Sequence, residues 1–222
     1  KRQVRDLLDD KKKVRVLVRD AKKILGQSWA SHVEIIEGNA SNAEDLDRAL
    51  DGIHTAYYLL HSINVATDFG DIESAMAKGF AEAADRAHIK QIIYLGGIAN
   101  DENRSRHLTS RMNTGTQLAT GSTPVLELRA GIIIGSGSAS FEMLRHLTHR
   151  LPIMTTPKWV SNRTQPIAIR DVLYYLRSAA NLAEPVDGIR DIGGPEVVTY
   201  AEMMQKFAAL SGLRKRIIIQ VP

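Results

Sequence analysis

Short apolar runs alternate with helix-like segments over the first 135 residues, and this alternation restricts the fold more than any other feature. Runs typical of buried strands lie at residues 14–18, 33–37, 55–60, 92–95 and 125–134. The clearest helical pattern covers residues 71–87, whose apolar face is expected to include Ile72 and Ala75. Shorter helices are expected over 41–50, with Ser41 as the N-cap, and over 200–210, with Thr199 as the N-cap. Strands that alternate with helices favour a parallel sheet with helices on both faces, so we expect a doubly wound α/β fold.

The regular alternation of strands and helices ends after residue 135, and the patterns at both ends of the chain are incomplete. Residues 1–10 have helical spacing with no start signal before them, and the apolar run at 217–222 has nothing after it. We therefore expect an N-terminally incomplete domain over residues 1–135. Residues 136–222 are expected to hold the rest of the sheet, interleaved with a small α/β portion that is C-terminally incomplete.

Composition excludes several classes of protein and site. The chain has no cysteine, which excludes disulfides and thiolate metal sites and fits a reducing cytoplasm. No apolar run approaches the roughly 18 residues that span a bilayer. The net charge is +4, but basic and acidic residues are interspersed, so nucleic-acid binding is not expected. His146 and His149 share a helix face without a third ligand nearby in sequence, so no metal site is expected.

A glycine pair and a polar stretch follow the apolar run at 92–95 and mark the expected site. Gly96 and Gly97 end this strand, and ligands of open α/β sheets bind at the carboxyl ends of strands. His107 and Arg111 follow on a helix-like segment, and their spacing of four places both on one face. We therefore expect the strand end and this helix face to meet the molecule that the protein binds.

Five segments together resemble an atypical, extended-type short-chain dehydrogenase/reductase of the nucleoside-diphosphate-sugar epimerase superfamily. They are VRVLVRD (14–20), YYLLHS (57–62), IIYLGG (92–97), LRAGIIIG (128–135) and TQPIAIRD (164–171). The nearest similarity is to the NmrA-like and complex I accessory subunit-like branches. The resemblance implies an NAD(P)-binding Rossmann fold whose first strand and Gly-x-x-Gly-x-x-Gly loop lie outside these 222 residues.

The resemblance places the adenosine of the cofactor at the ends of the first two strands. Arg19 stands where an arginine accommodates the 2′-phosphate of NADP, so NADP(H) is the preferred cofactor. Asp20 beside it leaves NAD(H) open, and a plain surface arginine is the structural alternative. Gly38, Asn39 and Ala40 stand where the family contacts adenine. Asparagine at a turn is equally explained by its tolerance of left-handed backbone.

The same resemblance places the nicotinamide at two other strand ends. Leu60, His61 and Ser62 would lie beside the nicotinamide ribose, although a histidine there could simply be a polar residue where the sheet meets water. Arg129 and Gly131 resemble the family's contact with the nicotinamide side. A glycine at position 131 would let the backbone approach a ligand closely, or would only mark a bulge.

In the family that the chain resembles, a Tyr-x-x-x-Lys pair carries the chemistry, together with a Ser or Thr at the end of the preceding strand. His107 and Arg111 occupy the corresponding positions, and the glycine pair stands where the hydroxyl would be. Histidine can transfer protons near neutral pH, and arginine can hold a ribose or a phosphate. Two functions remain open: NADP(H)-dependent hydride transfer to or from a carbonyl or alcohol, and a non-catalytic redox sensor or assembly subunit.

The expected partners also follow from the resemblance. The substrate should be a small molecule, which the sequence does not identify. Extended members often pair through the two helices that flank the 92–95 strand, so we expect a homodimer through residues 71–87 and 104–119.

Overall fold

The chain forms two compact units. The computed structural model describes residues 1–60, 69–98 and 106–220. Unit 1 comprises residues 1–129 and 173–191, and unit 2 comprises residues 130–172 and 192–222. Each unit thus takes residues from both sides of the boundary expected at residue 135, and the domain assignment stays a prediction.

Unit 1 alternates strands and helices, as the sequence predicts. Its helices are α1 (Arg2–Asp9), α2 (Lys22–Leu25), η1 (Ala30–His32, a 3-10 helix), α3 (Ala43–Leu50), α4 (Phe69–Arg86), α5 (Arg106–Leu118) and α7 (Ile169–Ala179). Its strands are β1 (Arg15–Val18), β2 (Glu34–Glu37), β3 (Thr55–Tyr58), β4 (Gln91–Gly97), β5 (Val125–Ala130) and β10 (Gly188–Ile192). Along the chain, β5, α7 and β10 each run across a boundary between the units.

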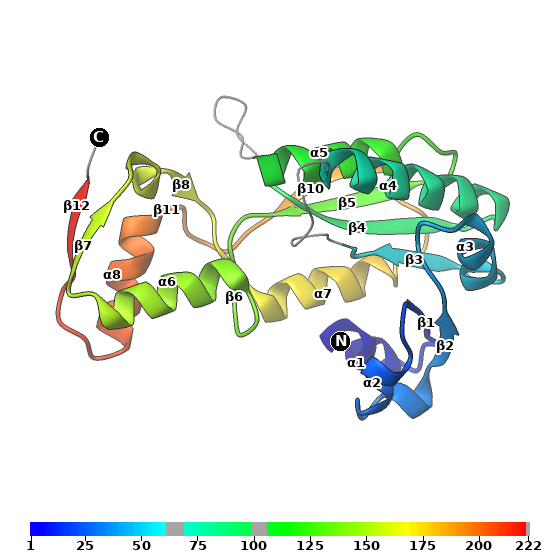
Figure 1. Ribbon diagram of the computed structural model, residues 1–222, viewed down its shortest axis with the longest axis horizontal. Coiled ribbons are helices and arrows are strands. Elements are labelled where there is room, and N and C mark those ends of the chain that lie inside the picture. Colours follow the sequence, from blue (N-terminus) through cyan, green and yellow to red (C-terminus); the bar gives the residue numbers. More distant parts are fainter. Residues whose placement is uncertain (61–68, 99–105, 221–222) are drawn as a thin grey trace. The chain divides into compact units, whose positions relative to one another are not determined.

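A four-stranded sheet forms the centre of unit 1. Its strand order is β10-β5-β4-β3, and β3 and β4 are parallel, with Thr55 opposite Gln91 and Tyr58 opposite Tyr94. The helices α4 and α5 lie side by side over one face, and α7 lies along the other (Figure 1). The strands β1 and β2 form a separate parallel pair. Helices on both faces of a parallel sheet confirm the doubly wound α/β fold.

Small side chains let α4 lie close to this sheet. Its alanines with no more than traces of exposed surface are Ala77, Ala81, Ala83 and Ala84. Phe80 packs edge-to-face against Tyr58 of β3, with 5.0 Å between ring centroids. Ile72 and Ala75 were expected on the same apolar face, but both are exposed. The buried stripe instead begins at Glu73, whose carboxylate accepts a hydrogen bond from Ser110 of the neighbouring helix α5.

Unit 2 builds a core of its own from short elements. Its helices are α6 (Ala139–Arg150), η2 (Lys158–Ser161, a 3-10 helix) and α8 (Tyr200–Leu210). Its strands are β6 (Ile133–Ile134), β7 (Ile153–Thr156), β8 (Arg163–Thr164), β9 (Ile167–Ala168), β11 (Val198–Thr199) and β12 (Ile217–Gln220). They form the pairs β6-β9, β8-β11 and β7-β12. Thr199 caps α8 as predicted, because its hydroxyl accepts a bond from the Glu202 backbone N–H and its own N–H donates to the Glu202 carboxylate.

The expected start of α3 is wrong by two residues. Ser41 was expected to cap this helix, but the helix begins at Ala43 and is capped by the side chain of Asn42. The Asn42 Oδ1 accepts a hydrogen bond from the Asp45 backbone N–H at 2.9 Å. Ser41 lies one residue before the cap, in a turn where its backbone N–H donates to the Asn39 side chain.

The strand expected over 125–134 is interrupted. β5 ends at Ala130, and the chain resumes as β6, which pairs in parallel with β9. The break falls at Gly131, where an added Cβ would lie 2.8 Å from the backbone oxygen of Gln165. A close approach of two backbones therefore explains this glycine without a ligand.

Candidate functional site

The carboxyl end of β4 meets the first turns of α5. The strand is fully buried up to Tyr94 and ends in Gly96 and Gly97. A Cβ at position 97 would lie 3.1 Å from the side chain of Leu108 and 3.6 Å from Arg111 Nε. The glycine pair thus lets α5 lie directly against the strand end, and the structure brings Gly96, Gly97 and Arg111 together as the sequence predicts.

The guanidinium of Arg111 is held at this strand end. Its Nη2 donates to the backbone oxygen of Leu95 at 2.7 Å. Its Nε is buried and has no hydrogen-bond acceptor among the described residues. Within the same part of the chain, no carboxylate forms an ion pair with Arg111. A buried cationic donor without an acceptor is unfavourable, so this position suits a ligand that accepts hydrogen bonds.

A buried carboxylate, which the sequence analysis missed, lies next to the glycine pair. Glu127 of β5 is almost fully buried and pairs with Arg129, with 2.7 Å between Oε1 and Nε. A Cβ at Gly96 would lie 2.5 Å from Glu127 Oε1, and a Cβ at Gly115 of α5 would lie 2.9 Å from its Cδ. The carboxylate therefore fills space that two missing side chains leave. The available signal was a glutamate within an apolar strand, two residues before an arginine.

The buried tyrosines of the sheet are structural rather than reactive. Tyr94 donates to the backbone oxygen of Arg111 at 2.9 Å, and burial raises the pKa of Tyr94 to about 12. Tyr57 donates to the backbone oxygen of Leu176, and burial raises its pKa to about 12 as well. Burial also raises the pKa of Tyr58. All three phenols therefore stay protonated near neutral pH.

Three predicted site residues can be placed only by position or not at all. His107 lies in α5, one helical turn before Arg111, and its side chain lies outside the described part of the structure. His61 and Ser62 also lie outside the described residues. Leu60 lies just beyond the end of β3 and is exposed, so its apolar surface is free to contact a ligand.

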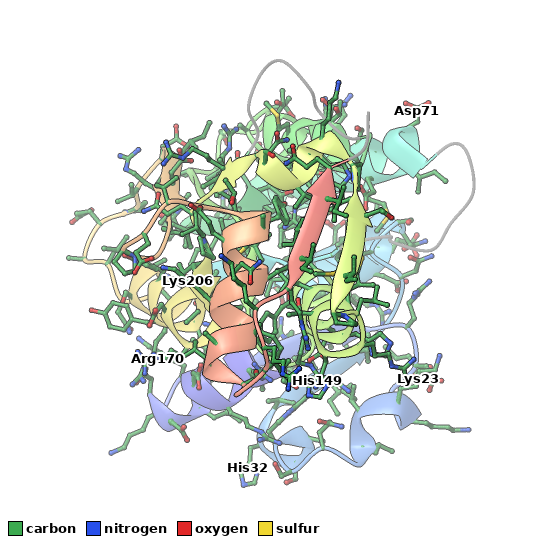
Figure 2. All side chains as sticks on the ribbon, turned by 90° about the vertical axis from the view of Figure 1, so that its left-hand side faces the viewer. Lys23, His32, Asp71, His149, Arg170 and Lys206 are labelled. Atoms are coloured by element: carbon green, nitrogen blue, oxygen red, sulfur yellow. The ribbon has the colours of Figure 1, made fainter. Side chains whose placement is uncertain are left out.

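Asp20 forms local hydrogen-bond and ion-pair contacts, whereas Arg19 forms none among the described residues. Asp20 Oδ1 accepts a bond from the Lys22 backbone N–H at 3.0 Å, and Lys23 lies 3.8 Å from the same carboxylate. Arg19 is exposed and has neither a hydrogen bond nor an ion pair among the described residues. Lys23 lies on the outer side of α2 (Figure 2). The end of β1 thus presents exposed positive charge while its one carboxylate is used locally.

The turn after β2 is organised around a carboxylate of α3. Asp45 Oδ2 accepts a bond from the Asn39 backbone N–H at 2.8 Å, and the Asp45 side chain leaves no room for a Cβ at Gly38. This backbone bond and Arg48 lower the pKa of Asp45. Asn39 Oδ1 accepts a hydrogen bond from the Ser41 backbone N–H, and Ala40 packs at the edge of the core. These contacts explain the glycine and the asparagine structurally, and their role toward adenine stays a prediction.

Metal-ligand clusters, membrane-spanning helices and the glycine-rich segment after β6 are three other features that could indicate a function. The described ranges contain no group of three or more His, Asp or Glu placed to hold a metal ion. Among the helices of those ranges, none is both long enough and apolar enough to cross a bilayer. Ser138, in the glycine-rich segment after β6, caps α6 by accepting a bond from the Phe141 backbone N–H.

The described side chains fit a dinucleotide at two places. At the end of β1, the free guanidinium of Arg19 can meet a phosphate. At the end of β4, the orphaned Nε of Arg111 lies beside a glycine that leaves room for a ligand to approach. These are the places at which ligands of open α/β sheets bind.

Solved structures share this fold, among them complexes with NADP(H) and with NAD. The Citrobacter sp. triphenylmethane reductase complexed with NADP(H) is 18% identical, with a TM-score of 0.76 over 99% of this chain and 74% of that chain. The Bacillus cereus UDP-N-acetylglucosamine 4-epimerase is 16% identical, with a TM-score of 0.73 over 98% of this chain and 79% of that chain. The Bordetella bronchiseptica enzyme WbmG in complex with NAD and UDP is 13% identical, with a TM-score of 0.75 over 99% of this chain and 78% of that chain. At these identities the similarity shows the fold alone.

Sequence comparison identifies the family. No curated protein matches the chain significantly. The family model described as NAD(P)H-binding matches residues 1–120, which is more than half of the chain and includes β1 to β4 and all of α5. The expected relationship to the atypical short-chain dehydrogenases/reductases is confirmed, and the chain belongs to the NAD(P)H-binding family.

Proposed function

We propose that the chain is the NADP(H)-binding part of an oxidoreductase that transfers a hydride between nicotinamide and a carbonyl or alcohol of a small molecule. The observation that supports this most is the Arg111 guanidinium at the carboxyl end of β4, with His107 one helical turn before it. The bound cofactor would supply or accept the hydride. His107 would transfer the proton, and Arg111 would hold the ribose.

Arg19 supports NADP(H) over NAD(H). It is exposed and unpaired among the described residues, whereas the carboxylate that would serve NAD, Asp20, is engaged by Lys22. A guanidinium can bind the 2′-phosphate with charge-assisted hydrogen bonds, and NADH lacks this group. The remaining proposed cofactor contacts are Gly38, Asn39, Ala40, Leu60, His61, Ser62, Gly96 and Gly97. The family resemblance alone would add Arg129 and Gly131.

A non-catalytic role is the second candidate, and one observation favours it. The phenol groups of Tyr57 and Tyr94 are buried and donate to backbone oxygens, and the phenol of Tyr58 is buried as well. None of these three groups can replace the missing tyrosine of the Tyr-x-x-x-Lys pair. If His107 does not transfer protons either, the site would bind the cofactor as a redox sensor or assembly subunit does.

Two measurements separate the candidates. Calorimetric titration of the full-length protein with NADPH and NADH tests the cofactor: strong NADPH binding with weak NADH binding is expected, and no binding of either would overturn the proposal. Oxidation of NADPH against a panel of carbonyl compounds then tests turnover. His107→Gln should lower turnover roughly 10²- to 10⁴-fold without changing NADPH affinity. His32→Gln, at an exposed histidine of η1, is the control. Equal turnover in both variants would remove His107 from the proton transfer, and the absence of turnover in the wild type would leave the non-catalytic role.

Two further parts of the proposal come from the family. We place the protein in the cytoplasm, which the lack of cysteine supports. We also expect a homodimer through α4 and α5, because these helices form one layer with an exposed outer surface that includes Ile72. Light scattering of the full-length protein tests this, and the mass of a monomer would contradict it.

A further inference from the structure

Two guanidinium groups lie near the glycine pair at the end of β4, one directly and one through a carboxylate. Arg111 Nε lies 3.6 Å from where a Cβ of Gly97 would be. On the Gly96 side, the corresponding space is filled by the carboxylate of Glu127, which forms an ion pair with Arg129. Arg111 of α5 and the Glu127–Arg129 pair of β5 thus lie near the same two glycines.

The charge of Arg111 is not neutralised. Its Nη2 donates to a backbone carbonyl, that of Leu95, and its buried Nε has no acceptor in the described part of the chain. The other buried carboxylate on this side of the sheet, Glu73, accepts a hydrogen bond from Ser110. A bound anion would give Arg111 both an acceptor and a counter-charge.

Arg129 is fixed in one orientation. Its Nε and Nη2 donate to the two oxygens of Glu127 at 2.7 and 3.4 Å, which uses one edge of the guanidinium. Glu127 is almost fully buried and lies against both Gly96 and Gly115. The side chain of Arg129 is still 22% exposed, so its other N–H groups remain within reach of a ligand. A guanidinium held by a buried carboxylate is a preorganised donor for carboxylate or phosphate oxygens.

We propose that Arg129 binds a carboxylate or phosphate group of the substrate, with the uncompensated charge of Arg111 near the same glycine pair. The substrate class of this site is then an anionic carbonyl compound or alcohol. This inference rests on the proposed function for the reaction, but the anion site itself does not require turnover. It assigns Arg129 to the substrate rather than to the nicotinamide, where the family resemblance would place it.

The test measures anion binding to the full-length protein saturated with NADPH. Inorganic phosphate and malonate are the probes, and sodium chloride of equal ionic strength corrects for screening. Both calorimetry and the shift in melting temperature report binding. At least one probe should bind the wild type. Phosphate alone would indicate a phosphorylated substrate, and malonate alone a carboxylate. No binding of either probe would overturn the proposal.

Variants then locate the site. Arg129→Met should weaken probe binding about tenfold or more, since it removes charge-assisted hydrogen bonds. Because Arg129→Met leaves Glu127 buried without its partner, the pair Glu127→Leu with Arg129→Met is made as well; it removes both charges and should show the same loss. Arg145→Met, at an exposed arginine that also pairs with a glutamate, is the control and should bind like the wild type.

The outcomes separate this proposal from the proposed function. Unchanged probe binding in Arg129→Met, with weaker NADPH binding, would assign Arg129 to the cofactor and overturn the substrate site. Probe binding that depends on Arg129 in a protein without NADPH affinity would keep the anion site and overturn the proposed oxidoreductase. Equal loss of probe binding in Arg145→Met would show non-specific attraction by positive charge and would also overturn the site.

Discussion

Two ends of the candidate site, both within unit 1, are built in different ways. The outer end consists of Arg19, Asp20, Gly38 and Asn39, which follow β1 and β2. Its hydrogen bonds join residues close in sequence, and its arginine is exposed. The inner end consists of Gly96, Gly97, Arg111, Glu127 and Arg129, which belong to β4, α5 and β5. Apart from the Glu127–Arg129 pair, its contacts join residues of different elements, and Glu127 is buried.

This difference suggests that the outer end recognises the ligand with a mobile side chain, whereas the inner end holds its charged groups in fixed positions. At the outer end a flexible, solvated arginine can meet a phosphate, and each contact there contributes little to the stability of the fold. At the inner end a charged pair is enclosed between glycines of two elements, so any change affects both packing and charge. Substitutions at the inner end should therefore change the free energy of unfolding, whereas those at the outer end should change ligand affinity.

The largest effect is expected at Gly115. Alanine there would place a Cβ against the enclosed carboxylate of Glu127, and we expect Gly115→Ala to lower the free energy of unfolding by about 2–3 kcal/mol. Gly79→Ala is the matched control, because Gly79 lies within α4 and has nothing within 4 Å of its added Cβ. It should stabilise the protein by about 0.5–1 kcal/mol. Urea unfolding measures both, and a neutral Gly115→Ala would show that Glu127 can move.

Alkaline pH should also weaken the inner end. Burial raises the pKa of Tyr94 to about 12, whereas an unfolded tyrosine ionises near pH 10. Between these pH values the folded state keeps a proton that the unfolded state loses. The stabilisation that comes from the neutral, buried phenol of Tyr94 is therefore fully present below about pH 10 and is lost as the pH rises through about 12. Urea unfolding over this range should show a shallower decline for Tyr94→Phe than for the wild type. The exposed Tyr174→Phe should follow the wild type, and parallel curves for all three would contradict the role of Tyr94.

At the outer end, a change of Arg19 should alter affinity and leave stability unchanged. Arg19→Gln removes the exposed guanidinium, so we expect NADPH binding to weaken about tenfold while NADH binding stays the same. Lys12→Gln, at another exposed cation of unit 1, is the control for general attraction of a phosphate-bearing ligand. Calorimetry measures the two affinities. Equal weakening of NADPH and NADH binding would place Arg19 away from the 2′-phosphate.

The sequence predicted the outer end better than the inner one, for a physical reason. Strand ends and turns are local patterns, so the apolar runs predicted β1 to β5, and Arg19 was visible as the residue after a strand. The role of Glu127 depends on Gly96 and Gly115, which lie in other elements, and no local pattern predicts that these three residues meet. Arg111 was identified only because its spacing from His107 resembles a family pair.

The smallest effect should come from the cap of α3, which supports the outer end. Asn42→Ala removes the acceptor for the Asp45 backbone N–H, and we expect it to lower the free energy of unfolding by about 1 kcal/mol. Ser41→Ala is the control, since its side chain was expected to be the cap but the structure uses Asn42; it should change stability by less than about 0.5 kcal/mol. Because Asp45 also holds the Asn39 backbone, fraying of this helix should slightly weaken NADPH binding in Asn42→Ala alone. Urea unfolding and calorimetry of the two variants measure this. If Ser41→Ala proved the more costly change, the start of α3 would lie where the sequence pattern placed it.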